Sequence, residues 1–424
     1  MLETDDRSVT TLPPRLGDAG WLVRPETRAV FDALAAGGYE ARAVGGAVRN
    51  ALLGLPPGDV DLATPARPED VMRLAAAAGL GTVPTGLAHG TVTVLSGGIP
   101  FEVTTLRRDV ETDGRHAAVA FTDDWKADAC RRDFTVNALY VDAEGTIFDP
   151  VGGYADLLAR RIRFIGDART RIREDFLRIL RFFRFDAQLG TGPLDAAGLA
   201  ACVAERGGLG RLSGERIRQE LVKLLAAPRA VAAVEAMFDY GLLTEILPVV
   251  PRLSWLSHLA AIETALDRAP DPIVRLAALG VAAAEDVERT AYRLRLANAE
   301  RATLALAARG GGQPSPALDD KAAKALLYRL GPKAWRTSCL LAWARTRAAP
   351  DSHAWQTLLT LPERWPPPLF PLRGADVLAL GVAPGPRVGD ILRALETWWI
   401  EAGMPPDGPD LRRRLWQESA IGKR

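Results

Sequence analysis

Hydrophobic and polar positions follow two different periods in the first 150 residues. Segments 59–64 (DVDLAT) and 91–105 (TVTVLSGGIPFEVTT) are rich in β-forming residues, which predicts strands. Segments 47–54 (AVRNALLG) and 68–79 (PEDVMRLAAAAG) have helical spacing and end at glycine, which predicts helices. A hairpin is expected around 144–145. This part of the chain therefore predicts an α/β domain.

The rest of the chain shows helical patterns. Segments 171–190 (RIREDFLRILRFFRFDAQLG) and 213–228 (SGERIRQELVKLLAAP) each predict a helix that ends at glycine or proline. Helices rich in alanine and leucine are expected over 256–348. The proline-rich stretch 363–371 (ERWPPPLFP) separates a last segment, 372–424. The pattern predicts an α/β head on a long all-α region.

Composition adds limits on the class of protein. With 424 residues, 48% of them hydrophobic and 25% charged, the chain is expected to form more than one globular domain. Its formal net charge is only +1, so any nucleic-acid surface has to come from local clustering of basic residues. No run of eighteen apolar residues occurs and the N-terminus is polar, so we expect a cytoplasmic protein without a membrane partner.

Few residues suit a zinc site. The three cysteines (Cys130, Cys202 and Cys339) are far apart, which favours a reducing compartment, and the four histidines are not clustered. A metal ion would therefore have oxygen ligands, which points to Mg²⁺.

The short span 44–64 combines a glycine turn with two acidic residues. On a strand, Asp59 and Asp61 would project from the same face, and two such carboxylates close together favour a cation between them. Gly45 and Gly46 precede a helix, where backbone N–H groups and Arg49 could bind a triphosphate. The alternative is a plain glycine turn beside an exposed acidic loop. We favour the phosphate and metal interpretation because both halves occur together. No GxxxxGK[ST] motif is present.

These motifs resemble those of a known family. The stretch GGAVRNALLG…DVDLAT is similar to the nucleotidyltransferase signature of class II CCA-adding enzymes and bacterial poly(A) polymerases, within the DNA polymerase β superfamily. The resemblance continues through RRDFTVNALY, DPVGGYADL and REDFLRILRFFRF to SGERIRQEL, and so covers about residues 40–225. Asn50 is a departure, because the family usually has aspartate after the arginine. The usual carboxylate is expected to support the turn rather than bind metal.

The resemblance implies a domain order and a catalytic site. It implies an N-terminal extension, a nucleotidyltransferase head with a polymerase-β-like mixed sheet, a helical neck, a helical body and an RNA-binding tail. We place these at residues 1–24, 25–155, 156–225, 226–365 and 366–424. Asp59 and Asp61 would hold Mg²⁺ for phosphoryl transfer, and Glu102 would be a third carboxylate that helps to activate the primer 3′-hydroxyl. An ordinary solvent-facing strand glutamate is an equal alternative for Glu102.

The segment between Arg160 and Arg184 contains nine arginines against three acidic residues, a local excess that marks an anion-binding surface. On one continuous helix, Asp175 and Arg178 would lie a turn apart, as an acceptor beside a donor. Such a pair complements the edges of cytosine and adenine but not those of uracil and guanine. A solvated arginine face is the alternative.

In the resembled family, this EDxxR motif is the protein template for CTP and ATP. The resemblance also implies that Asp149 and Asp156 link head and neck. The nucleotide-binding positions that it implies, together with the glycine turn, are Gly45, Gly46, Arg49, Arg132, Asp175, Arg178, Arg181 and Arg184.

Two further segments bear on the RNA product. Residues 107–121 predict a polar hairpin around Asp113-Gly114, which in CCA-adding members helps the change from C to A addition. Gly385-Pro386 runs into a helix and, with Arg387, could contact an RNA phosphate; a plain packing unit is the alternative.

The sequence therefore predicts a Mg²⁺-dependent tRNA nucleotidyltransferase that adds CCA from CTP and ATP and releases pyrophosphate. The alternatives are a poly(A) polymerase of the same fold, a CC-only or A-only enzyme, and an RNA-binding protein with an inactive head. tRNA is the expected partner, and no protein partner is inferred.

Overall fold

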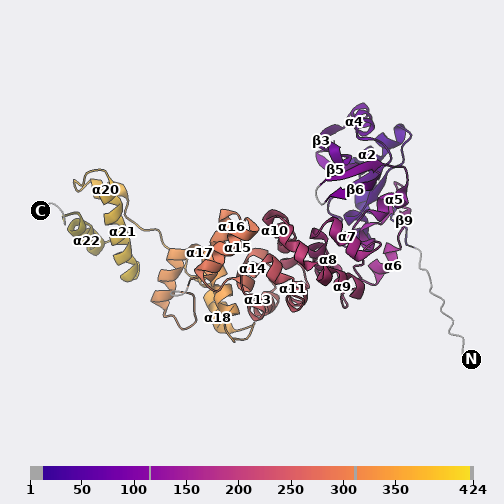
Figure 1. Ribbon diagram of the computed structural model, residues 1–424. Coiled ribbons are helices and arrows are strands. Elements are labelled where there is room, and N and C mark those ends of the chain that lie inside the picture. Colours follow the sequence, from indigo (N-terminus) through magenta and orange to yellow (C-terminus); the bar gives the residue numbers. More distant parts are fainter. Residues whose placement is uncertain (1–12, 114–115, 310–312, 421–424) are drawn as a thin grey trace, which may run out of the picture. The chain divides into compact units, whose positions relative to one another are not determined.

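The computed structural model describes residues 13–113, 116–309 and 313–420. Contacts divide the chain into two compact units, one ending at Ile246 and the other starting at Leu247. The first unit contains a β-sheet with flanking helices, followed by a group of helices (Figure 1). The domain boundaries given above stay predictions.

A mixed seven-stranded sheet organises the first unit. Its strand order is β3-β4-β5-β2-β1-β8-β9. Only β2 and β5 pair in parallel, and the other neighbours are antiparallel. The predicted mixed sheet is therefore confirmed. The strands are β1 (Arg42–Val44), β2 (Asp61–Thr64), β3 (Gly81–Gly86), β4 (Thr91–Ser96), β5 (Ile99–Thr105), β8 (Tyr140–Val141) and β9 (Ile147–Phe148).

Hydrophobic residues are buried on both faces of this sheet. Helices α2 (Pro25–Ala36) and α4 (Pro68–Ala77) both contact β4, and each begins with proline in its first turn, where the missing N–H is not needed. A second cluster forms around Val44, Ala63 and Tyr140, and α5 (Trp125–Cys130) supplies Trp125 to it. The ends of β1 and β2 are thereby held firmly at the place where the predicted site residues emerge.

Asp156 ties the sheet to the helices that follow. It lies on α6 (Gly153–Leu158), is completely buried, and accepts hydrogen bonds from Thr135 (2.7 Å), Arg161 (2.8 Å) and Arg163 (2.8 Å). Asp149 accepts hydrogen bonds from two backbone N–H groups at the start of α6. The contacts of Asp156 agree with the linking role implied for it, whereas those of Asp149 stay within residues 149–154.

The helical part of the first unit begins with a correction. The arginine-rich segment was predicted as one helix, but it forms α7 (Ala168–Glu174) and α8 (Leu177–Leu189), and Asp175 between them is extended at φ −155°, ψ 107°. Helix α8 packs on α10 and α11. The remaining elements are α9 (Ala196–Ala204), η3 (Arg206–Arg211), α10 (Gly214–Leu225), α11 (Ala230–Asp239) and α12 (Leu243–Ile246).

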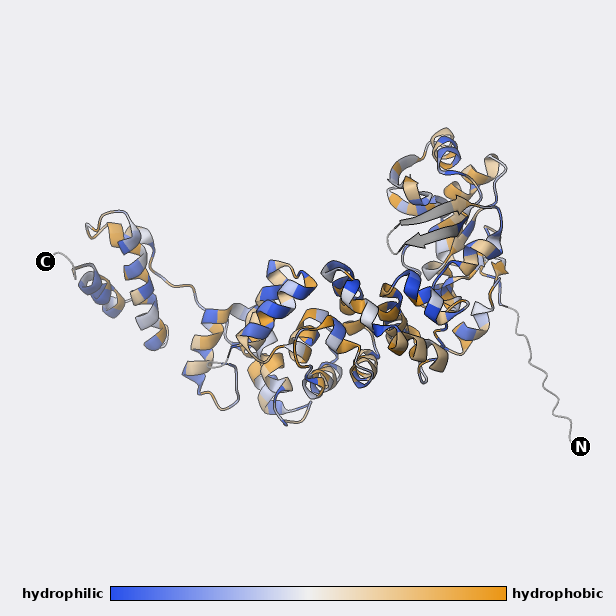
Figure 2. Ribbon diagram, viewed as in Figure 1, coloured by the Kyte–Doolittle hydropathy of each residue, from blue (hydrophilic) through white to orange (hydrophobic). Residues whose placement is uncertain are grey.

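The second unit is helical throughout the residues described. Most of its helices carry both hydrophobic and hydrophilic residues (Figure 2), as expected for helices that bury one side. Its helices are α13 (Leu253–Ala265), α14 (Pro272–Gly280), α15 (Ala284–Leu294), α16 (Asn298–Ala307), α17 (Asp320–Ala344), α18 (His353–Leu359), α19 (Leu361–Arg364), α20 (Gly374–Leu378), α21 (Pro386–Glu401) and α22 (Pro409–Ala420). Helix α17 is kinked at Gly331, which has φ 74° and precedes a proline.

The helix predicted to follow Gly385-Pro386 is confirmed, because α21 begins at Pro386. Leu395 and Trp399 of α21 form the centre of a separate hydrophobic cluster in the last part of the chain. None of the described helices combines the length and apolar character needed to cross a membrane.

We expect Asp156→Ala to lower the free energy of unfolding by about 2–4 kcal/mol, because it leaves one buried hydroxyl and two guanidinium groups without their acceptor. Chemical denaturation followed by circular dichroism measures the change. Asp123→Ala, an exposed residue of the same unit, is the control. A loss below about 0.5 kcal/mol for Asp156→Ala would contradict the role assigned to this carboxylate.

Candidate active site

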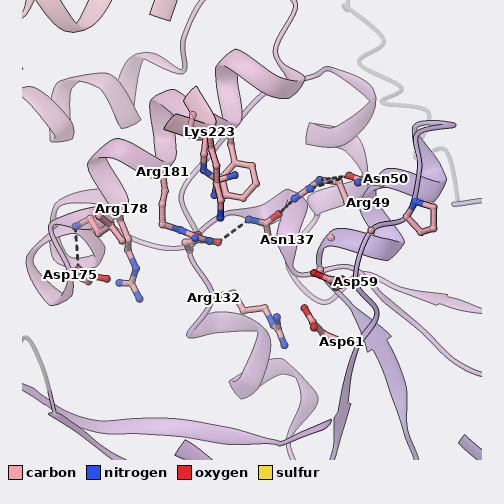
Figure 3. Close-up of a pocket in the computed structure, with 18 of the residues that line it drawn as sticks. Arg49, Asn50, Asp59, Asp61, Arg132, Asn137, Asp175, Arg178, Arg181 and Lys223 are labelled. Atoms are coloured by element: carbon pink, nitrogen blue, oxygen red, sulfur yellow. Dashed lines mark hydrogen bonds and ion pairs between the residues drawn. The ribbon is translucent and has the colours of Figure 1, made fainter. Parts of the chain in front are cut away.

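The first unit contains a pocket of about 700 Å³ between the end of the sheet and the helices α8 and α10. Every predicted site residue lines this pocket except Glu102. These lining residues are Gly45, Gly46, Arg49, Asp59, Asp61, Arg132, Asp175, Arg178, Arg181 and Arg184. Residues that are more than a hundred positions apart in the sequence are therefore brought together (Figure 3).

The glycine turn follows β1 directly. Gly45 has φ 77° and ψ −122°, a conformation that only glycine adopts without strain, and it precedes α3 (Gly46–Leu52). Arg49 of α3 is buried and donates hydrogen bonds to the side-chain oxygens of Asn50 and Asn137. Burial and the positive charge of Arg184 lower the pKa of Arg49 to about 10. Among the residues that the structure describes, the guanidinium of Arg49 therefore has no carboxylate partner.

Asn50 has a structural role at the position where the sequence departs from the resembled family. Its side-chain oxygen accepts from Arg49 at 3.0 Å, and its side-chain nitrogen donates to the Pro56 carbonyl at 2.9 Å. The amide thus supports the turn, as expected for this position.

The two aspartates are arranged somewhat differently from the prediction. Strand β2 begins at Asp61, so Asp59 lies in the preceding bend and not on the strand. Both side chains nevertheless face the same pocket (Figure 3). Glu102 of β5 is the parallel neighbour of Asp61 in the sheet, and its side chain is exposed. The parallel pairing thus brings a third carboxylate next to the pocket.

Asp61 shows the effect of this crowding. Burial, the charge of Glu102 and the charge of Asp59 together raise the pKa of Asp61 to about 6, although Arg132 acts in the opposite direction. The negative charge of these carboxylates is therefore only partly compensated by Arg132. Such oxygen ligands fit a hard divalent cation such as Mg²⁺. In the part of the chain that the structure describes, no group of three or more His, Cys, Asp or Glu residues forms a metal site.

Asp175 and Arg178 lie at the opposite end of the pocket from the aspartates (Figure 3). The break between α7 and α8 means that they do not share a helix, and each side chain is held by a different partner. Asp175 accepts from Arg216 of α10 at 2.7 Å and from the backbone N–H of Leu177 at 3.1 Å. Arg178 donates to Glu174 and to a backbone carbonyl.

The other two arginines of α8 are held by carboxylates as well. Arg181 donates to Asp133 at 2.7 Å. Arg184 is buried, pairs with Glu220 of α10, and lies over the Phe185 ring at 3.9 Å from its centroid. The alternative of a solvated arginine face is thus wrong for Arg184.

Asp133 connects two sides of the pocket. Burial acts to raise the pKa of Asp133, but the charge of Arg181 and the hydrogen bond from Asn137 bring it below its usual value. Asn137 in turn accepts from Arg49. A continuous hydrogen-bonded chain thus joins the glycine turn to α8, and part of it is visible in Figure 3.

Arg132 lies between the aspartates and the helices. It pairs with Asp128 at 3.1 Å and donates to the Tyr140 hydroxyl at 3.1 Å. Only the surrounding motif indicated this residue, and the structure brings it to the pocket.

Four lining residues with polar or charged side chains were not singled out from the sequence. They are Asp133, Asn137, Arg216 and Lys223. The first two lie in RRDFTVNAL, and the others lie in SGERIRQELVKLL. The spacing of positions 216, 220 and 223 is helical and all three are charged. A charged face on a helix whose other side is apolar could have indicated that Arg216 and Lys223 line a site.

The predicted hairpin is present. Strands β6 (Arg107–Asp113) and β7 (His116–Phe121) form a separate two-stranded sheet. The turn residues Gly114 and Arg115 lie outside the described residues.

Comparisons with known proteins agree with this geometry. Residues 41–163 match the Poly A polymerase head domain, and residues 194–253 match the probable RNA and SrmB-binding site of polymerase A. The mitochondrial CCA tRNA nucleotidyltransferase 1 of Mus musculus is 35% identical over 379 residues, which cover 86% of this chain and 84% of the mouse protein. The CCA-adding enzyme of Geobacillus thermodenitrificans is 43% identical over 226 residues, 53% of this chain and 55% of that enzyme.

Solved structures show the same architecture. The Bacillus stearothermophilus CCA-adding enzyme in complex with CTP superposes with a TM-score of 0.70 at 30% identity and covers 90% of this chain and 94% of that chain. The Thermotoga maritima CCA-adding enzyme complexed with tRNA has a TM-score of 0.67 at 18% identity, over 96% of this chain and 99% of that chain, which supports the fold alone.

A mixed-sheet head with paired carboxylates at its edge and an arginine-rich helix opposite defines a nucleotidyltransferase. The chain belongs to the family of class II CCA-adding enzymes and poly(A) polymerase heads.

In the presence of EDTA, we expect Asp61→Asn to stabilise the protein at pH 8 by about 1–2 kcal/mol, after allowance for solvent screening. The folded pKa near 6 lies above the ordinary aspartate value of 3.8, so the carboxylate destabilises the fold increasingly between these pH values and fully above them. The gain should therefore vanish below pH 3.8. Denaturation at pH 3.5 and pH 8 measures it, with exposed Asp32→Asn as control. An equal effect at both pH values would contradict the crowding argument.

Proposed function

We propose that this chain is a tRNA nucleotidyltransferase that adds CMP, CMP and AMP to tRNA 3′ ends from CTP and ATP and releases pyrophosphate. The observation that carries the proposal is the single pocket that has a pair of carboxylates at one end and the Asp175 and Arg178 pair at the other. The names of the mouse and bacterial relatives support the same activity.

Asp59 and Asp61 would hold Mg²⁺, with Glu102 beside them. When bound, the ion supplies positive charge to the triphosphate and lowers the pKa of the primer 3′-hydroxyl. The protein's own residues add further positive charge. Arg49 of α3 and Arg132, which follows α5, both line the same cavity. Glu102, as the sheet neighbour of Asp61, would help to activate the 3′-hydroxyl by accepting its proton.

Base selection would rest on Asp175 and Arg178. A carboxylate has about four acceptor sites, and in Asp175 two are used by Arg216 and the Leu177 N–H, which leaves others for an exocyclic amine. Arg178 would donate to the ring nitrogen beside that amine. Cytosine and adenine satisfy both groups, whereas uracil would leave both mismatched, at about 1–3 kcal/mol for each unpaired group.

The second unit would hold the RNA. Gly385 at the start of α21 and the basic helix α22 suit contacts to the tRNA backbone, and Arg387 already donates to the Ser419 carbonyl at 3.4 Å. The cytoplasmic location expected from the sequence also stays a prediction.

A poly(A) polymerase remains the second candidate, because both matching family models are named for polymerase A. One assay separates the candidates: purified protein, Mg²⁺, tRNA that lacks its terminal trinucleotide, and each nucleotide alone and in combination. We expect two additions with CTP and three with CTP and ATP together. Long tracts with ATP alone would indicate a poly(A) polymerase, and an arrest after two residues with both nucleotides would indicate a CC-adding enzyme.

We expect Asp59→Ala and Asp61→Ala each to reduce incorporation of both nucleotides by a factor of 10³ or more, because the metal would lose one of two protein ligands. Single-turnover incorporation with Mg²⁺ measures the loss, and Asp32→Ala, at an exposed residue of α2, is the control. Retained activity in either aspartate variant would refute the metal assignment.

We expect Arg178→Ala to reduce the preference for CTP over UTP by about 10- to 100-fold, since the donor to the ring nitrogen is lost. The ratio of kcat/KM values for the two nucleotides measures it. Arg173→Ala is a matched control, because Arg173 lies on α7 and pairs with Glu205 outside the pocket. Unchanged selectivity in Arg178→Ala would exclude the template role.

A further inference from the structure

The positive charges that line the pocket differ in how they are compensated. Within the described residues the cations are Arg49, Arg132, Arg178, Arg181, Arg184, Arg216 and Lys223. Five of these arginines form ion pairs with carboxylates of the protein. Arg49 is bonded to two neutral asparagine side chains. The positive charges of the pocket that lack a carboxylate partner among the described residues are therefore those of Arg49 and Lys223.

Lys223 is the more exposed of these two. Over the residues that the structure describes, its ammonium group has neither a hydrogen bond nor an ion pair, although it lines the pocket. The nearest carboxylate on the same face of α10 is Glu220, three positions earlier, and Glu220 is already engaged by Arg184 and lies 3.8 Å from Arg181. An ammonium in this position has three free donors.

The position of Lys223 along α10 suggests what it binds. Arg216, Glu220 and Lys223 follow the helical repeat on the pocket side, and Arg216 contacts Asp175 at the base-reading end. Lys223 is seven residues further, roughly 10 Å along the helix axis, and so is displaced from that end. In the view of Figure 3 it lies between Arg181 and Arg49. The ammonium group of Lys223 thus lies in the part of the pocket away from Asp175.

We infer that Lys223 binds a phosphate group of the reacting substrates and, with Arg49, completes the anion site of the pocket. The inference rests on the proposed function only for the identity of the substrates. The phosphate can come from the triphosphate of the incoming nucleotide or from the last phosphodiester of the RNA primer, because both carry the same chemistry. The charges of Arg184 and Arg181 lower the pKa of Arg49, although Asp133 acts in the opposite direction, so an anion beside Arg49 would be stabilised.

Three variants of the full-length protein test this. Lys223→Gln removes the charge, Lys223→Arg keeps it, and Lys126→Gln is the control, because Lys126 is the other lysine described in the first unit and does not line the pocket. Dissociation constants are measured with Mg²⁺ for CTP alone, for tRNA lacking its terminal trinucleotide alone, and for inorganic tripolyphosphate. Each titration is repeated at several salt concentrations.

In Lys223→Gln we expect binding about 10-fold weaker for one of these ligands and a salt dependence reduced by about one charge, with Lys223→Arg near wild type. Loss with CTP and tripolyphosphate assigns the nucleotide, and loss with tRNA alone assigns the primer. Dissociation constants within twofold of wild type for all three ligands overturn the inference. If the wild type adds no nucleotide to tRNA, the proposed function fails, and the tripolyphosphate titration still decides the role of Lys223.

Discussion

The mutual repulsion of carboxylates at one edge of the sheet is the constraint on which this site depends. Strands β2 and β5 are the only parallel pair in the sheet, and this pairing fixes Asp61 beside Glu102 while Asp59 approaches from the bend before β2. Burial raises the pKa of Asp61, and the charges of Glu102 and Asp59 raise it further. Such an arrangement costs stability in the free protein and is relieved by a cation, which is the usual pattern for a functional site and not for a structural one.

On the opposite wall of the pocket the charges are mainly positive, and carboxylates of the protein pair with most of them. Helix α10 supplies Arg216 to Asp175 and Glu220 to Arg184, so it fixes residues of the α7–α8 segment from behind. A guanidinium held by a carboxylate loses less side-chain entropy when a ligand arrives, because its orientation is already set. Helix α10 therefore fixes the orientation of Asp175 and Arg184, although it lies outside the EDxxR motif.

Local patterns in the sequence were sufficient for most of the architecture. The alternation in TVTVLS, the glycine after AVRNALL and the loss of strand patterns after the head all correspond to the structure, and ten of the predicted residues meet in one pocket. Strand β3 was missed because it is an exposed edge strand without an apolar face. The break at Asp175 was missed because the hydrophobic repeat continues across it, and the tertiary contact of Asp175 with the distant Arg216 is not visible in local periodicity. The partner of each arginine could not be read from periodicity, since it depends on tertiary packing.

All the groups that line the pocket come from the stretch between Gly45 and Lys223, within the first compact unit. The groups proposed to read the base and to hold the metal are thus encoded separately from the final 178 residues (Leu247–Arg424). The proposed selection of cytosine and adenine can therefore be kept while the later helices change to suit a different RNA.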